Sequence, residues 1–241
     1  MLFDFKIVNW AARASGRESR AQWQSWAGAA GDATAASPGK DLPMMLRRRL
    51  TATGQAALAA AGEANAPQEA RYVFCSRHGE FTRTTRLLQA VAERESLSPA
   101  DFSVSVHNAL AGILSIASQS QEGHTAIAHG PDSFAAGLIE AIGLLAVYPD
   151  MPILLVYFDD DLPPPYDEIE PPEAEGGLAL AVLLGAGGDT GLPVQVTITT
   201  AADEAPDGTT RQALDFVRFL ASGEAECSTA GSTFDLRWRR A

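Results

Sequence analysis

The chain has 241 residues and a formal net charge of −12. A surface this acidic repels phosphate backbones and anionic lipid headgroups, so nucleic acid and anionic membranes are excluded as expected partners. The two cysteines, Cys75 and Cys227, are too few and too far apart for a disulfide framework or a metal site. No uninterrupted apolar run reaches the roughly 18 to 20 residues that span a bilayer. We therefore expect a cytoplasmic protein without a membrane span, a metal or another cofactor.

The first half of the chain alternates strand and helix patterns. An opening strand is predicted over 3–10, followed at 11–40 by a mobile insert rich in Ala, Gly and Ser. Pro43 starts a helix that we expect to continue to about Ala61. The other elements predicted before residue 120 are a short helix at 20–26, a buried strand at 72–75, and helices at 82–93 and 106–118.

The second half adds the remaining strands of one sheet. Strands are predicted at 125–128 and 153–158, two paired strands at 178–184 and 194–199, and a closing strand at 233–238. Helices are predicted at 133–147 and 210–221, and an acidic, proline-rich loop at 159–175. These elements predict a single α/β domain over 1–241, with a mixed sheet covered by helices.

The segment from Gly123 to Ala141 reads as a strand, a tight Gly-Pro turn and an apolar helix that begins near Ser133. Such a turn presents one side chain at a helix N-terminus, where unpaired N–H groups and the helix dipole favour a thiolate or an oxyanion. The residue at this position is Asp132. Either Asp132 or Ser133 also suits a purely structural role as the N-cap of the helix.

Five motifs in order resemble the beta-ketoacyl synthase-like, N-terminal family, and in particular the short members that accompany aryl polyene and related pigment gene clusters. They are Pro43–Leu50, Phe74–Glu80, the Ser-Val-His-Asn-Ala run at 105–109, Asp132-Ser-Phe134 and Leu162–Tyr166. When Asn108, Ala111 and Gly112 are laid on the family pattern, Asp132 falls where the family carries its catalytic cysteine. The resemblance implies a thiolase-like half, equivalent to the N-terminal half of a ketoacyl synthase.

This resemblance implies a subunit that lacks the family's chemistry. All four histidines, at 78, 107, 124 and 129, precede residue 130, so the two catalytic histidines of the family's second half have no counterpart. The implied function is that of a chain length factor, which pairs with a complete, cysteine-bearing ketosynthase in fatty acid or polyketide-type biosynthesis. The basic run Arg47–Arg49 is either solvated or a contact for an acidic partner such as an acyl carrier protein.

In such pairs the acyl tunnel of the active subunit reaches the interface, where side chains of the partner stop the growing chain. The resemblance implies four candidates for the tunnel end, which are Ala100, Phe102, Val104 and Phe134. It also implies that the interface is supported by Ser105, Val106, His107 and Asn108.

Two other functions remain open. The chain could be a small acyl-processing hydrolase or transferase that uses His129, Asp132 and Ser133, although adjacent residues at a helix start point in different directions. It could also be a scaffold that binds carrier proteins. The predicted helices at 106–118 and 133–147 are apolar on nearly every side and must be covered, either by a partner or by the C-terminal part of the chain.

Overall fold

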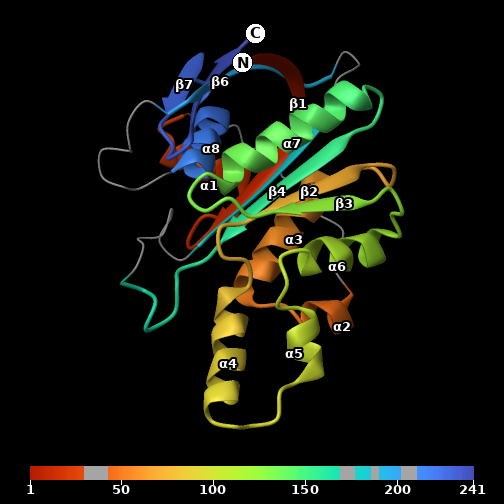
Figure 1. The fold of residues 1–241 in the computed structure, drawn as a ribbon. Coiled ribbons are helices and arrows are strands. Elements are labelled where there is room, and N and C mark those ends of the chain that lie inside the picture. Colours follow the sequence, from red (N-terminus) through yellow and green to blue (C-terminus); the bar gives the residue numbers. More distant parts are fainter. Residues whose placement is uncertain (30–42, 169–176, 186–189, 202–210) are drawn as a thin grey trace.

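A mixed sheet runs through the centre of the molecule, with helices on both faces (Figure 1). The computed structural model describes residues 1–29, 43–168, 177–185, 190–201 and 211–241, and within these the sheet has eight strands in the order β3-β2-β4-β5-β1-β6-β8-β7. The strands are β1 (Leu2–Ala14), β2 (Arg71–Cys75), β3 (His124–Ile127), β4 (Ile153–Asp159), β5 (Leu178–Gly185), β6 (Leu192–Thr200), β7 (Glu226–Thr229) and β8 (Phe234–Arg240). Among the described residues, the parallel strand pairs are β2–β3 and β2–β4, and the other neighbouring strands pair antiparallel.

The helices divide between the two faces of the sheet. They are α1 (Arg20–Trp26), α2 (Met44–Arg47), α3 (Ala52–Ala64), α4 (Phe81–Ala92), α5 (Pro99–Ser103), α6 (Ala109–Ser118), α7 (Ser133–Val147) and α8 (Gln212–Ser222). Helices α1, α7 and α8 pack on one face, which we call the α7 layer. Helices α3 and α6 pack on the other, the α3 layer, and α4 and α5 extend away from the sheet beyond it (Figure 1).

The central strands are apolar along their whole length because both of their faces are covered. In β4, Leu155 and Tyr157 contact the α7 layer, while Val156 and Phe158 contact the α3 layer. In β5 the side chains that face α3 are small alanines, which lets an alanine-rich helix approach the sheet closely. The fold prediction is confirmed, since a helix-covered mixed sheet accounts for both core layers.

A β-bulge in β1 lets apolar side chains on both halves of this long strand pack into the α7 layer. The pairing register with β5 shifts between Ile7 and Asn9. Before the bulge the odd-numbered Phe5 and Ile7 face the α7 layer, and after it the even-numbered Trp10 does so. One extra residue reverses the alternation of side chains, so the bulge restores burial that a regular strand would lose.

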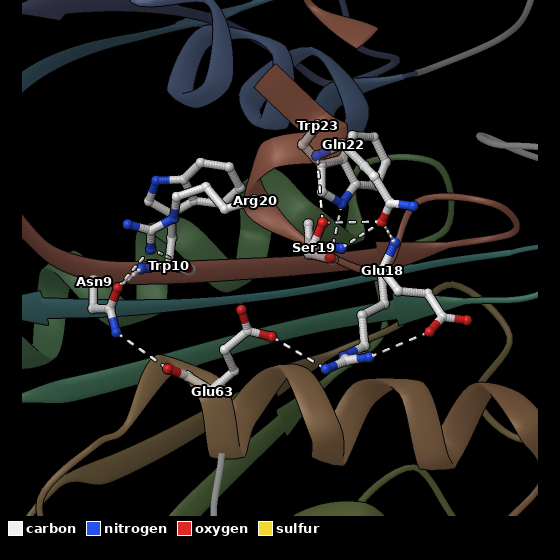
Figure 2. A network of polar contacts seen from close by, with 10 residues as sticks. Asn9, Trp10, Glu18, Ser19, Arg20, Gln22, Trp23 and Glu63 are labelled. Carbon is white, nitrogen blue, oxygen red and sulfur yellow. Dashed lines mark hydrogen bonds and ion pairs between the residues drawn. The ribbon is translucent and has the colours of Figure 1, made fainter. Parts of the chain in front are cut away.

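Two parts of the predicted insert at 11–40 belong to regular elements of the fold. Residues 11–14 complete β1, and α1 is fastened to that strand (Figure 2). The indole Nε1 of Trp23 donates to Ala12 O at 2.7 Å, and Arg20 donates to Asn9 Oδ1 at 2.6 Å while stacking over the Trp10 ring. Burial lowers the pKa of the Arg20 guanidinium, and nearby Glu63 opposes this shift. Residues 30–42 of the predicted insert lie outside the described residues.

Three further predictions need correction. Strands β5 and β6 do not pair with each other, because β1 lies between them and pairs with both. The helix expected over 43–61 is two helices, since the Thr51 hydroxyl accepts the Gly54 N–H and starts α3 afresh. Helix α5 and strand β7 were not predicted. Of the predicted loop at 159–175, Asp159 ends β4 and residues 169–175 lie outside the described residues.

Candidate functional site

The carboxyl ends of β2, β3 and β4 meet at one end of the sheet, because these three strands are parallel. The turn that follows β3 carries the residues predicted to present a nucleophile. Gly130 has a φ of 54°, a left-handed conformation that suits glycine, and α7 begins at Ser133. Asp132 therefore lies at a strand-to-helix junction, as the sequence predicts.

The carboxylate of Asp132 is buried and fully engaged. The residue is 1% exposed. Its Oδ1 accepts hydrogen bonds from Gln212 Nε2 at 2.8 Å and from the Ser232 N–H at 3.1 Å, and its Oδ2 accepts from the Thr233 N–H at 2.7 Å. Asp132 occupies the N-cap position of α7, but its side chain makes no capping hydrogen bond to that helix. It instead ties the start of α7 to the connection between β7 and β8.

Gln212 completes this anchor from the first residue of α8. Its Oε1 accepts the Ala135 N–H at 3.2 Å, which satisfies an amide in the first turn of α7, and its Nε2 also donates to Phe234 O at 2.8 Å. Gly231 lies so close that a Cβ at this position would collide with Asp132 Oδ1 and Gln212 Nε2. The C-terminal segment thus covers the turn where the resemblance expects a nucleophile.

The residues of the hydrolase alternative are near one another in the chain but do not assemble into a catalytic group. The Ser133 hydroxyl is buried, donates to Gly130 O at 2.7 Å and accepts the His129 N–H at 2.9 Å. The His129 ring stacks on Phe234, with ring centroids 5.9 Å apart. The described contacts of Asp132 go to Gln212 and to backbone amides rather than to His129. The geometry gives the hydrolase alternative no support.

Cys75 lies inside β2 and not at the turn. It is buried, and its thiol is so close to α7 that a Cβ at Gly137 would lie 2.5 Å from its Sγ. Cys227 is partly exposed on β7, and burial, together with the nearby carboxylates of Asp215 and Glu224, raises the pKa of its thiol. Neither position resembles the activated thiolate of a condensing enzyme.

A second polar cluster follows β2 at the same end of the sheet. Arg77 Nε lies 3.5 Å from Asp159 Oδ2, and the His78 N–H donates to Asp159 Oδ1 at 3.3 Å. Gly79 has a φ of 64°, and the His107 ring lies over it, since a Cβ there would be 3.2 Å from His107 Cε1. Nε2 of His107 is buried and has no hydrogen-bond partner among the described residues. These charges organise the loop at 76–80.

The four predicted tunnel-end residues do not come together in this chain. Phe102 on α5 is 62% exposed, Ala100 is exposed beside it, and Val104 packs against the α3 layer. Phe134 lies on the opposite face of the sheet, in the α7 layer, where it contacts Tyr157 and Phe216. The predicted interface residues 105–108 connect α5 to α6, and Val106 is exposed among them.

The apolar helices are covered in different ways. Gly130–Val147 is long and apolar enough to span a membrane, yet half of it is buried inside the fold, against β2, β4 and α8, as in a core helix. Its cover comes partly from the C-terminal part of the chain, through the contact of Phe134 with Phe216. Helix α6 keeps Ile116 exposed.

Among the described residues, no three His, Cys, Asp or Glu side chains are grouped so as to hold a metal ion.

Solved structures with the same fold include condensing enzymes and their partners. A chain from the complex of the ketosynthase ApeO with its chain length factor ApeC, from Xenorhabdus doucetiae, is 29% identical with a TM-score of 0.82, and the match covers 99% of this chain and 100% of that one. A chain of the ishigamide ketosynthase/chain length factor is 16% identical with a TM-score of 0.62, covering 92% and 74%. A beta-ketoacyl synthase from Burkholderia phymatum STM815 is 11% identical with a TM-score of 0.59, covering 92% and 71%.

A comparison with curated proteins gives no significant match. The model of the family described as "Beta-ketoacyl synthase, N-terminal domain" matches residues 21–239, which is nearly the whole chain. The match over residues 21–239 shows that the chain belongs to the beta-ketoacyl synthase N-terminal domain family.

Proposed function

We propose that this chain is a non-catalytic ketosynthase-like subunit that pairs with a complete ketosynthase and limits the length of the acyl chain, as a chain length factor does in aryl polyene biosynthesis. The observation that carries the proposal is the burial and the hydrogen bonding of the Asp132 carboxylate. Condensing enzymes transfer an acyl group to a thiolate, whereas this carboxylate is buried and accepts three hydrogen bonds from the C-terminal segment. The position of the nucleophile serves here as a structural anchor.

The match to the ApeO–ApeC complex supports the proposed pairing. It spans almost the whole of both chains, so this protein shares its length as well as its fold with a member of a ketosynthase and chain length factor assembly. At 29% identity the likeness also extends beyond the fold to the sequence. The acyl substrate and the aryl polyene setting are part of the proposal.

The edge of the sheet at β3 supplies a surface for the partner. Among the described residues, β3 has a neighbour only on one side, where it pairs with β2. An edge strand offers unpaired backbone groups to another strand. Exposed apolar side chains also lie on the α5–α6 segment, at Phe102, Val106 and Ile116, and α6 of this segment contacts β3. We therefore place the ketosynthase against β3 and the α5–α6 segment, with Ser105, Val106, His107 and Asn108 at the contact.

Phe102 is the side chain that we place at the end of the partner's acyl tunnel. A rigid ring that reaches into a tunnel stops a growing chain sterically, without chemistry of its own. Ala100 and Val104 flank it on the same short helix and its end. Phe134 is not part of this gate, because it lies across the sheet in the α7 layer. The exposed Arg47–Arg49 run at α2 is the site we propose for an acidic carrier protein.

The test is reconstitution with a complete ketosynthase and a carrier protein from the source organism. We expect a stable complex on size-exclusion chromatography and longer products when Phe102 is replaced by Ala. Leu88→Ala is the matched control, because Leu88 is similarly exposed but lies on α4. Unchanged product lengths with a bound Phe102→Ala variant would contradict the gate. Binding to carrier protein alone would favour a scaffold, and thioester turnover by the isolated chain would favour a hydrolase.

A further inference from the structure

Helix α5, which carries the proposed gate residue Phe102, has no buried side chains to hold it to the rest of the protein. Its neighbour α4 has a single buried residue, and that residue is the charged Arg83, while apolar Leu88 and Val91 of α4 are exposed. The position of α5 therefore cannot follow from hydrophobic burial of its own side chains, and polar contacts must contribute to it.

Arg83 makes those polar contacts. Its side chain is 11% exposed, and its Nη1 forms an ion pair with Asp101 Oδ1, one residue before Phe102. Its Nη2 donates to Arg49 O at 2.7 Å and lies 3.5 Å from Glu80 Oε2. One guanidinium thus joins α5, the start of α4 and the connection between α2 and α3. The guanidinium of arginine carries its donors on separate nitrogens and can therefore reach acceptors on three segments, whereas lysine would have to reach them from a single nitrogen.

The acceptors of Arg83 are themselves fixed to the body of the fold. Glu80 is buried, and its Oε1 accepts the Thr51 hydroxyl at 2.5 Å. A Cβ at Gly54, in the first turn of α3, would lie 2.6 Å from the same Glu80 oxygen, so the carboxylate packs directly on that helix. On the other side, the Ser98 hydroxyl accepts the Asp101 N–H at 3.2 Å and caps α5. A continuous polar path therefore leads from α3 to the residue beside Phe102.

We propose that Arg83 is the positioning residue that sets where Phe102 stands, and hence how sharply the complex limits acyl chain length. This inference rests on the proposed chain-length function. The partner would contact α5 directly. Because α5 has no buried residues, that contact would displace it unless the ion pair with Arg83 fixes Asp101. Loss of the contact should broaden the range of product lengths, whereas loss of the Phe102 ring should shift that range upwards.

Hydrogen–deuterium exchange on the full chain tests the contact without any partner. In Asp101→Asn, which keeps the backbone N–H that Ser98 caps, we expect amides between 98 and 106 to exchange about three- to five-fold faster, the scale of one partly exposed ion pair. Exchange in β2, β4 and α7 should not change. Arg86→Met, at an exposed position one turn further along α4, is the control and should leave the whole pattern as it is. Unchanged exchange over 98–106 in Asp101→Asn would overturn the proposal.

Product analysis in the reconstituted complex tests the consequence. Arg83→Met and Asp101→Asn should each give a broader length distribution than the parent, whereas Asp101→Glu, which keeps a carboxylate opposite Arg83, should stay close to the parent. If Phe102→Ala shifts the products while Arg83→Met and Asp101→Asn do not broaden them, the positioning role fails and the chain-length function stands. If Phe102→Ala has no effect on bound complex, the chain-length function itself fails.

Discussion

Two aspartates at helix starts, Asp132 and Asp101, are held in opposite ways. Asp132 is buried and takes its donors from residues 80, 100 and 101 positions away in the chain. The Asp101 side chain is 49% exposed, and its ionic partner is Arg83 on the adjacent helix. The first aspartate is therefore fixed by the tertiary fold, and the second by one side chain at its edge. We therefore expect the protein to be rigid at Asp132, where we propose that related synthases carry their nucleophile, and adjustable at α5, where we propose that it meets an acyl chain.

The largest expected difference in the free energy of unfolding is between replacement of Phe134, in the α7 layer, and replacement of Phe102, on α5. Phe134→Ala should lower the free energy of unfolding by about 3–5 kcal/mol, because the ring is 1% exposed and leaves a cavity between β4 and α8. Phe102→Ala should change it by less than about 0.5 kcal/mol, since the ring is exposed. Urea unfolding monitored by circular dichroism measures both. A large loss for Phe102→Ala would mean that α5 contributes to the core.

The next largest difference in the free energy of unfolding is expected between the two aspartate substitutions, Asp132→Asn and Asp101→Asn. Asp132→Asn places an amide NH₂ or a single carbonyl against three donors, so we expect a loss of about 2–4 kcal/mol in the free energy of unfolding. Asp101→Asn should cost less than about 1 kcal/mol, because its partner interaction is screened by solvent. The same urea titration compares them. Equal losses would remove the contrast between a buried anchor and an exposed contact.

Two glycines in α7 provide a finer comparison inside the rigid region. Gly137→Ala should destabilise the protein by about 1–3 kcal/mol, because the new Cβ would lie 2.5 Å from Cys75 Sγ in β2. Gly143→Ala should stabilise it by about 0.5–1 kcal/mol, because open space surrounds that position and alanine favours the helix. Thermal melting temperatures should therefore move in opposite directions. If both substitutions stabilise, α7 is not seated against β2 as described.

The smallest expected effect is chemical. Asp132→Cys introduces the nucleophile that the resemblance implies for this position, but Gln212, Ser232 and Thr233 still cover it. We expect no acyl adduct at residue 132 when the folded variant is incubated with an acyl thioester and analysed by mass spectrometry. Rapid acylation of this variant would show that the turn is open to substrate and would weaken the structural contrast.

Local patterns in the sequence were sufficient for the turn at Asp132. A short apolar strand, a Gly-Pro pair and an apolar helix are signals within about twenty residues, and α7 begins and ends as predicted. Gln212 and Gly231 could not be found in this way, because they meet Asp132 only after the C-terminal segment folds over α7. Nothing near Gln212 in the sequence distinguishes it from an ordinary helix residue.

The same limit explains the errors in the sheet. Strands β5 and β6 are consecutive apolar segments, which favours a hairpin, but the strand that separates them comes from the other end of the chain. Helix α5 was missed because its five residues are too few to show a helical period, although Ser98-Pro99 is a typical helix start. Arg83 reads as a surface residue of an amphipathic helix, and only its contacts with Asp101 and Arg49 identify it as buried.

The position of β1 has a consequence for synthesis on the ribosome. Its N-terminal part pairs with β6, where Leu2 lies opposite Thr197. Its later residues pair with β5, where Lys6 lies opposite Gly185. The first strand to emerge is thus the one that waits longest for both of its neighbours, with Phe5, Ile7 and Trp10 lacking their final cover. Pairings this distant in sequence form slowly and expose apolar surface to aggregation. We therefore expect nascent chains to keep this apolar surface of β1 uncovered until residues 178–200 have left the ribosome.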